Sequence, residues 1–235
     1  MASSSSLTKL VFFACFLLLF TFSDNLVAGQ SDKVQLNVYY DSLCSDCQDF
    51  IVNYLVEFFD SDLFTITNVT FVPFGNDELS DNQTVTCQHG EYECQLNEYE
   101  ACIIRTVPDP KLQYSFIRCI ENYTTNWPSS CFNGSAAAKQ AVISDNCYYS
   151  DLGRKLILGY ANQTLSLNPK PDFVPWITVN GDPFYSHHID DLIATVCTAY
   201  KGTASLPTQC SSTALAERKG WSKLQVSYAN EAINY

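Results

Sequence analysis

Basic residues are scarce in this chain. Its 235 residues include 13 lysines and arginines against 25 aspartates and glutamates, which gives a formal net charge of -12. This balance argues against nucleic acid and anionic membranes as partners, because both carry negative charge themselves. Ordinary solubility explains the acidic surplus more simply than adaptation to an acidic compartment does.

Long apolar runs are also few, since Leu10–Phe22 has no counterpart later in the sequence. This run is shorter than the roughly 20 residues of a membrane-spanning helix. Lys9 precedes it, and the small residues Ala28 and Gly29 follow near a plausible cleavage point. We therefore predict a signal peptide over residues 1–29, entry into the secretory pathway and no stable membrane insertion.

The centre of the chain is a strand, a pair of cysteines and a helix, in that order. Val34–Tyr40 alternates apolar and polar residues, which is typical of a strand. Phe50–Phe59 repeats apolar residues at helical spacing. Between them, Cys44 and Cys47 form a CxxC motif at the start of the helix, a context that favours redox chemistry.

The position of the first cysteine predicts its reactivity. Free N–H groups and the dipole at a helix N-terminus stabilise a thiolate, which is the attacking species in thiol–disulfide exchange. We predict Cys44 as the nucleophile, with a lowered pKa, and Cys47 as the resolving residue, although Asp46 opposes this ionisation. A zinc half-site, or bonds from these cysteines to other parts of the chain, are the alternatives.

Glycosylation motifs and cysteines support a secreted chain. Five acceptors for N-linked glycans occur, at Asn68, Asn82, Asn122, Asn133 and Asn162. Apart from Cys15 and the CxxC pair, eight cysteines remain: Cys87, Cys94, Cys102, Cys119, Cys131, Cys147, Cys197 and Cys210. An even number in an oxidising route predicts four structural disulfides, whose pairing the sequence leaves open.

The rest of the chain alternates in character. Leu63–Phe74 is expected as a second strand, parallel to the first. Helices are predicted over Glu91–Arg105, Tyr114–Tyr123, Ser135–Ser144 and Asp151–Tyr160. A hairpin of Trp176–Val179 with Phe184–Tyr185, and a helix over Ile189–Tyr200, follow them.

Together these elements predict an α/β chain. We expect one domain over residues 30–205, with a disulfide-stapled helical insertion at about residues 79–160. The segment 206–235 is expected to be a loosely ordered or processed tail, which Cys210 ties down at its start.

The insertion opens with a specific motif. Residues 87–102 read C-Q-H-G, two residues, E-C, two residues, N and a further cysteine at Cys102. This resembles the signature of the gamma-interferon-inducible lysosomal thiol reductase family. The upstream CxxC, the V-P-W-I-T-V-N-G segment and the V-C-x-x-Y-K-G ending are also similar to that family.

The resemblance implies a thioredoxin-like fold that reduces protein disulfides at acidic pH in lysosomes. It implies that Cys44 and Cys47 are the redox pair. It also implies that Pro175 is the proline that is cis in such folds, with Val174 offering backbone groups to an extended substrate. An external small thiol would regenerate the pair, and no metal or organic cofactor is expected.

Histidines near the motif invite other roles. His89 is expected to be structural rather than a catalytic base, and His187 and His188 to be capping or surface groups. A zinc site from Cys87, His89 and Cys94 is the less favoured alternative to disulfides.

Three functions therefore remain open. The first is a disulfide reductase, in a lysosome- or vacuole-like compartment or outside the cell. The second is an oxidase or isomerase of secreted proteins, since direction depends on reduction potential. The third is a non-enzymatic, disulfide-rich glycoprotein with a permanently closed CxxC.

Overall fold

The computed structural model describes residues 32–125, 130–131, 147–148, 150–186 and 188–216. The predicted signal peptide, the helix predicted over residues 135–144, Asn133, His187 and the tail beyond residue 216 lie outside these ranges.

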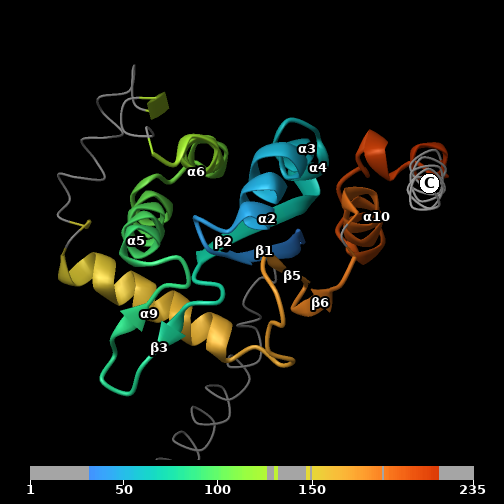
Figure 1. Ribbon diagram of the computed structural model, residues 1–235. Coiled ribbons are helices and arrows are strands. Elements are labelled where there is room, and N and C mark those ends of the chain that lie inside the picture. Colours follow the sequence, from blue (N-terminus) through green and yellow to red (C-terminus); the bar gives the residue numbers. More distant parts are fainter. Residues whose placement is uncertain (1–31, 126–129, 132–146, 149, 187, 217–235) are drawn as a thin grey trace, which may run out of the picture. The chain divides into compact units, whose positions relative to one another are not determined.

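A four-stranded mixed sheet forms the centre of the described fold (Figure 1). Its strands are β1 (Val34–Tyr40), β2 (Thr67–Pro73), β5 (Trp176–Val179) and β6 (Asp182–Phe184), in the order β2-β1-β5-β6. The pair β1–β2 is parallel, whereas β1–β5 and β5–β6 are antiparallel. Asn180 and Gly181, both at positive φ, turn the chain between β5 and β6. The α/β class is thus confirmed.

The second strand begins later than the sequence predicts. Residues Leu63–Ile66 form a short helix, α4, and β2 begins at Thr67. Leu63 and Ile66 are both completely buried. Residues three apart lie on one face of a helix but on opposite faces of a strand, so burying both favours the helical turn. The prediction of a strand over Leu63–Phe74 was therefore wrong for Leu63–Ile66.

The first helix is interrupted rather than continuous. It consists of α2 (Ser45–Asp49), a π-helical segment (Phe50–Tyr54) and α3 (Val56–Phe59). The N–H of Leu55 donates to the carbonyl of Phe50, five residues earlier, at 2.8 Å. This widened turn leaves carbonyls available to other partners.

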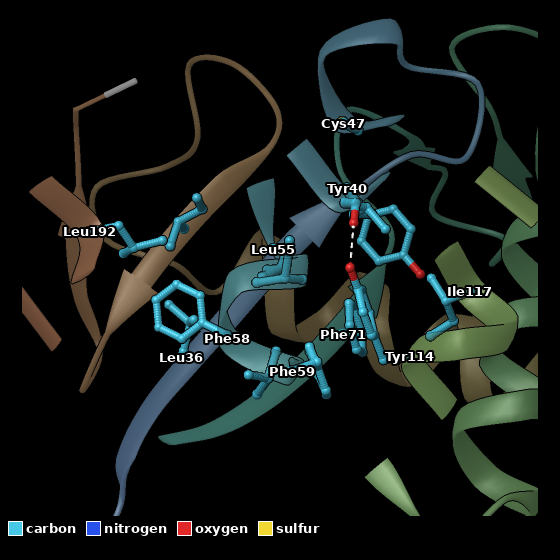
Figure 2. Close-up of a cluster of buried hydrophobic side chains, with 14 of the residues drawn as sticks. Leu36, Tyr40, Cys47, Leu55, Phe58, Phe59, Phe71, Tyr114, Ile117 and Leu192 are labelled. Atoms are coloured by element: carbon cyan, nitrogen blue, oxygen red, sulfur yellow. Dashed lines mark hydrogen bonds between the residues drawn. The ribbon is translucent and has the colours of Figure 1, made fainter. Parts of the chain in front are cut away.

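Side chains of α6 (Pro110–Tyr123) donate hydrogen bonds to carbonyls of this segment. The Tyr114 hydroxyl donates to the Ile51 carbonyl at 3.0 Å, and Arg118 Nε donates to the Val52 carbonyl at 2.9 Å. The Tyr114 ring also stacks on Phe59, with centroids 4.0 Å apart (Figure 2). The insertion thus packs directly against the helix that follows the CxxC.

The insertion contains more than helices. Its helices are α5 (Glu91–Thr106), α6 and α9 (Asp151–Leu165), and it opens with the hairpin β3 (Glu78–Leu79) and β4 (Val85–Thr86). Strands of two residues are too short to give an alternation, so the sequence did not predict them. Within the described residues, no helix is long and apolar enough to span a membrane.

Four disulfides join the eight cysteines that are predicted to be structural. They pair Cys87 with Cys94, Cys102 with Cys147, Cys119 with Cys131, and Cys197 with Cys210. The first three lie in the insertion, whereas the last links α10 (Ile189–Ala199) to the 3-10 turn Thr208–Cys210. The start of the segment 206–235 is thus covalently held to α10.

Tyr114 offers a test of the contact between α6 and the π-helical segment. Replacing Tyr114 with phenylalanine keeps the ring stack but leaves the buried Ile51 carbonyl without this donor. We expect the free energy of unfolding to fall by about 1–2 kcal/mol, measured by urea denaturation. The exposed Tyr123 on the same helix is the matched control. An equal effect of Tyr123→Phe would contradict the assignment.

Candidate active site

The two CxxC cysteines differ in exposure. Cys44 is the N-cap of α2, and its residue is 8% exposed, whereas Cys47 is completely buried. They are joined as a disulfide, and the N–H of Cys47 donates to Cys44 Sγ at 3.2 Å. A negative charge on Cys44 would therefore receive a backbone donor as well as the local field of the helix N-terminus. Asp46, between them, is exposed to solvent.

The segment before β5 lies against Cys44. The Val174–Pro175 peptide bond is cis, and the Val174 carbonyl oxygen is 3.8 Å from Cys44 Sγ. Val174 is 7% exposed, so the contact is largely protected from water. Val174 and Pro175, which the family resemblance implies as substrate-binding residues, thus lie beside Cys44, the predicted nucleophile.

The loop that leads into the CxxC is held by the insertion. Asn97 Oδ1 on α5 accepts hydrogen bonds from both the N–H and the hydroxyl of Ser42, at 3.0 and 2.5 Å. Glu93 Oε2, one turn earlier, accepts from the N–H of Leu43 at 3.2 Å. Buried backbone donors need partners, and here the partners come from a segment about 50 residues away. Asn97 and Glu93 therefore fix the backbone just before Cys44.

A second contact ties the same loop to the end of β2. Both carboxylate oxygens of Asp41 accept backbone hydrogen bonds, from Gly75 and Asn76, each at 2.7 Å. A Cβ atom at Gly75 would lie 2.7 Å from Asp41 and from a Val174 methyl group. Only glycine therefore allows the loop, the end of β2 and the cis-proline segment to approach so closely.

Asp77 connects this arrangement to the first disulfide of the insertion. Its carboxyl group accepts from the side chain of Asn97 at 2.9 Å and from the N–H of Gln88 at 3.1 Å. It also lies 3.2 Å from Cys87 Sγ. Burial, and then the nearby charge of Asp41, raise the pKa of Asp77 to about 8. Asp77 therefore holds a proton at acidic pH, which lowers the cost of burying it.

Two further acids are buried behind β1. The Tyr40 hydroxyl donates to Glu100 Oε2 at 2.5 Å. Burial raises the pKa of Glu100 to about 7, and burial together with the charge of Glu100 raises the pKa of Glu121 well above its usual range. Because two carboxylates in one apolar site cannot both ionise cheaply, protonation stabilises this pair.

The alternative prediction of a zinc site at Cys87, His89 and Cys94 requires free cysteine thiolates. Oxygen or sulfur atoms of Asp77, Cys87 and Glu93 lie within 4.8 Å of one another. Cys87 is, however, bonded to Cys94, and zinc binds cysteine as a thiolate. The Nδ1 atom of His89 lies 2.6 Å from Glu93 Oε2, so its ring faces this carboxylate. The residues as bonded here do not suit a zinc site.

Other predicted residues lie at the surface. Four of the glycan acceptors, Asn68, Asn82, Asn122 and Asn162, are exposed. His188 is exposed and is the N-cap residue of α10, without a side-chain cap bond. Glu93, Asn97, Asp41 and Asp77 were not predicted as site residues. Only the position of Glu93 and Asn97 in the family-like motif pointed to them.

Comparison with known proteins agrees with the motif. The family model described as gamma interferon inducible lysosomal thiol reductase (GILT) matches residues 35–135. A gamma-interferon-responsive lysosomal thiol protein of Arabidopsis thaliana is 59% identical over 238 residues, covering 99% of both chains. A gamma-interferon-inducible lysosomal thiol reductase of Mus musculus is 33% identical, covering 80% of this chain and 76% of the mouse protein.

Among solved structures, reduced DsbA1 from Neisseria meningitidis is similar in fold. Its TM-score is 0.50 at 12% sequence identity, and the match covers 82% of this chain and 90% of that chain. Identity this low bears on the fold alone. It confirms the thioredoxin-like α/β fold that the resemblance implied.

Asn97 allows a test of the link between the insertion and the CxxC loop. Asn97→Ala removes the acceptor for Ser42 and the donor to Asp77, both of which are buried. We expect a loss of about 1–3 kcal/mol in unfolding free energy and slower thiol–disulfide exchange by the folded variant. Urea denaturation and a disulfide-reduction assay measure the two effects. Gln95→Ala, on the same helix, is the control, and equal behaviour of both variants would argue against the role of Asn97.

The buried acids predict how stability depends on pH. Glu100 titrates near 7 in the folded chain, against about 4.3 when unfolded. Between these values the folded state holds a proton that the unfolded state loses, so stability falls as pH rises. The chain should therefore be more stable at pH 5 than at pH 8, and Glu100→Gln should reduce this difference by roughly 2 kcal/mol.

Thermal or urea unfolding at the two pH values measures this effect. Glu91→Gln, an exposed position on the same helix, should leave the difference unchanged. Stability that rises with pH across this window would contradict the assignment.

Proposed function

We propose, since this chain belongs to the gamma interferon inducible lysosomal thiol reductase family, that it reduces disulfide bonds of protein substrates through Cys44 and Cys47. The chain is a thiol–disulfide oxidoreductase, which removes the non-enzymatic alternative. The reducing direction, the acidic setting and the roles of the two cysteines are our proposals.

One observation carries the roles of the cysteines. Cys44 is the more accessible of the two, accepts the N–H of Cys47 and lies against the Val174 carbonyl, whereas Cys47 is buried. A substrate sulfur can therefore approach Cys44 but not Cys47. The same backbone donor that contacts Cys44 would stabilise its thiolate.

The reaction takes two exchanges. The Cys44 thiolate attacks one sulfur of the substrate disulfide, so a mixed disulfide forms and the other substrate sulfur leaves as a thiolate that takes up a proton. The Cys47 thiolate then attacks Cys44 Sγ. The second substrate sulfur leaves and is protonated, and the Cys44–Cys47 disulfide forms. Substrate gains two electrons, and the cysteine pair loses them.

An external small thiol would return the pair to the reduced state. Two thiol molecules are oxidised to one disulfide in each cycle, so no metal or organic cofactor takes part in this scheme. Val174 and Pro175 would receive the substrate chain beside Cys44, since backbone groups bind extended peptides with little regard to sequence.

A lysosome- or vacuole-like compartment fits this proposal, with the extracellular space as the other location. Two relatives are named lysosomal thiol reductases. Asp77, Glu100 and Glu121 all have raised pKa values because of burial, so an acidic medium favours the folded chain. Four exposed acceptor asparagines are consistent with a glycosylated protein of the secretory pathway.

Reduction of insulin by the chain with a small-thiol donor, at about pH 5 and pH 7, tests the function. We expect activity at pH 5 that Cys44→Ser abolishes, because this variant lacks the attacking sulfur. Cys47→Ser should instead accumulate a mixed disulfide with the substrate, visible on a non-reducing gel, because the resolving thiol is missing.

Folding of each variant is checked by circular dichroism. Absence of activity at both pH values, in a folded chain whose CxxC can be reduced, would contradict the reductase proposal. Measuring the reduction potential of the pair against a glutathione buffer would then test the oxidase alternative.

A further inference from the structure

A cavity of about 360 Å³ lies beside the redox pair. Apolar side chains from four elements line it: Phe50 from the π-helical segment, Ile177 from β5, Phe184 from β6, and Ile189 and Leu192 from α10. Its size is at the lower end of the roughly 300–1,000 Å³ typical of ligand pockets. We call this cavity the apolar groove.

The apolar groove adjoins the reacting sulfur. Asp46 of the CxxC, Val174 and Pro175 all belong to its lining. The carbonyl of Val174 is also the group 3.8 Å from Cys44 Sγ. A substrate chain whose cysteine is bonded to Cys44 therefore has its neighbouring residues at the groove.

Charge on the groove has one dominant sign. Asp46 and Asp49, both exposed on α2, belong to its lining, and no lysine or arginine does among the described residues. Asp49 accepts only a neutral hydrogen bond of those described, from Asn53 at 2.7 Å. His188, from the N-cap of α10, is the lining group that can carry positive charge.

We propose that the apolar groove selects substrate segments that place an apolar side chain next to the reactive cysteine and a lysine or arginine beside it. This inference rests on the proposed reductase function and names the substrate class of that site. The apolar side chain is removed from water against Phe184 and Leu192. The basic side chain keeps its charged end in solvent, near Asp46 and Asp49, while its aliphatic part covers the groove rim.

Such a preference suits broad but not indiscriminate recognition. Backbone contacts at Val174 would accept any extended chain, and the groove then adds a bias through side chains. Repulsion adds to it, because a substrate carrying glutamate at the same place would face two carboxylates. Exposed ion pairs contribute only weakly to binding, so the groove ranks substrates rather than excluding any of them.

The test compares three synthetic peptides of symmetric sequence, so that the direction of binding does not matter. Each carries its central cysteine in a disulfide with a fluorescence-quenching thiol. The first has Lys-Leu-Cys-Leu-Lys, the second has glutamates in place of the lysines, and the third has serines in place of the leucines. The measured quantity is kcat/KM at pH 6 and fixed ionic strength.

We expect the lysine peptide to exceed the glutamate peptide by about 3- to 10-fold at low salt, the range that one or two exposed charge pairs support. The ratio should fall toward one in 0.5 M NaCl, because salt screens exposed charges. The serine peptide, which differs from the lysine peptide only in lacking the leucines, should be reduced more slowly than the lysine peptide at both salt concentrations.

Asp49→Lys is the decisive variant, because Asp49 lies outside the CxxC and changes the groove charge without altering the motif. It should bring the ratio of the two peptides close to one, because the introduced positive charge offsets the remaining carboxylate of Asp46. Asp81→Asn removes one exposed acid elsewhere, in the loop between β3 and β4, and should leave the wild-type ratio unchanged. A ratio between two peptides cancels any general effect of a variant on the exchange rate.

The outcomes separate this inference from the proposed function. Reduction of all three peptides at equal rates overturns the groove selectivity and leaves the reductase intact. A lysine preference that Asp49→Lys does not change also overturns it. Failure of the folded wild type to reduce any peptide, and insulin as well, refutes both.

Discussion

The hydrogen bonds from Asn97 and Glu93 to the loop before Cys44 are the constraint on which the site depends. Sheet and first helix alone leave the N–H groups of Ser42 and Leu43 facing the interior without acceptors. Unpaired donors of this kind cost about 1–3 kcal/mol each. The helical insertion supplies the acceptors, so it is part of the redox site. Its contact at Tyr114 with the π-helical segment fixes the other end of the same helix.

This constraint gives a physical reason for the spacing of the motif at residues 87–102. Gly90, at φ 92°, starts α5, and the disulfide between Cys87 and Cys94 closes the preceding turn onto it. Glu93 and Asn97 then lie four residues apart on one face of the helix, directed at the same loop. The Asn97 amide nitrogen donates a hydrogen bond to Asp77, and Cys87 of the disulfide lies beside the Asp77 carboxyl group.

Elements set by local pattern could be predicted from the sequence, whereas those set by distant partners could not. The strand over Val34–Tyr40 and the helix from Glu91 follow from periodicity and a motif. The turn at Leu63–Ile66 and the π-helical segment arise from burial against other elements. The CxxC could be singled out by its context. Asn97 could not be given its role, because only the tertiary structure brings it to Ser42.

The acidic residues of the chain include an exposed group and a buried group, and the two differ in hydration. Asp46 and Asp49 are exposed, keep their hydration and can act on a substrate at the groove. Asp77, Glu100 and Glu121 are buried, and burial raises the pKa of each. Lowering the pH protonates these three buried acids, because burial raises their pKa values. An acidic medium therefore removes the cost of holding these charges in the interior, which stabilises the folded chain. The formal charge of -12 conceals this division, which is why composition alone favoured simple solubility.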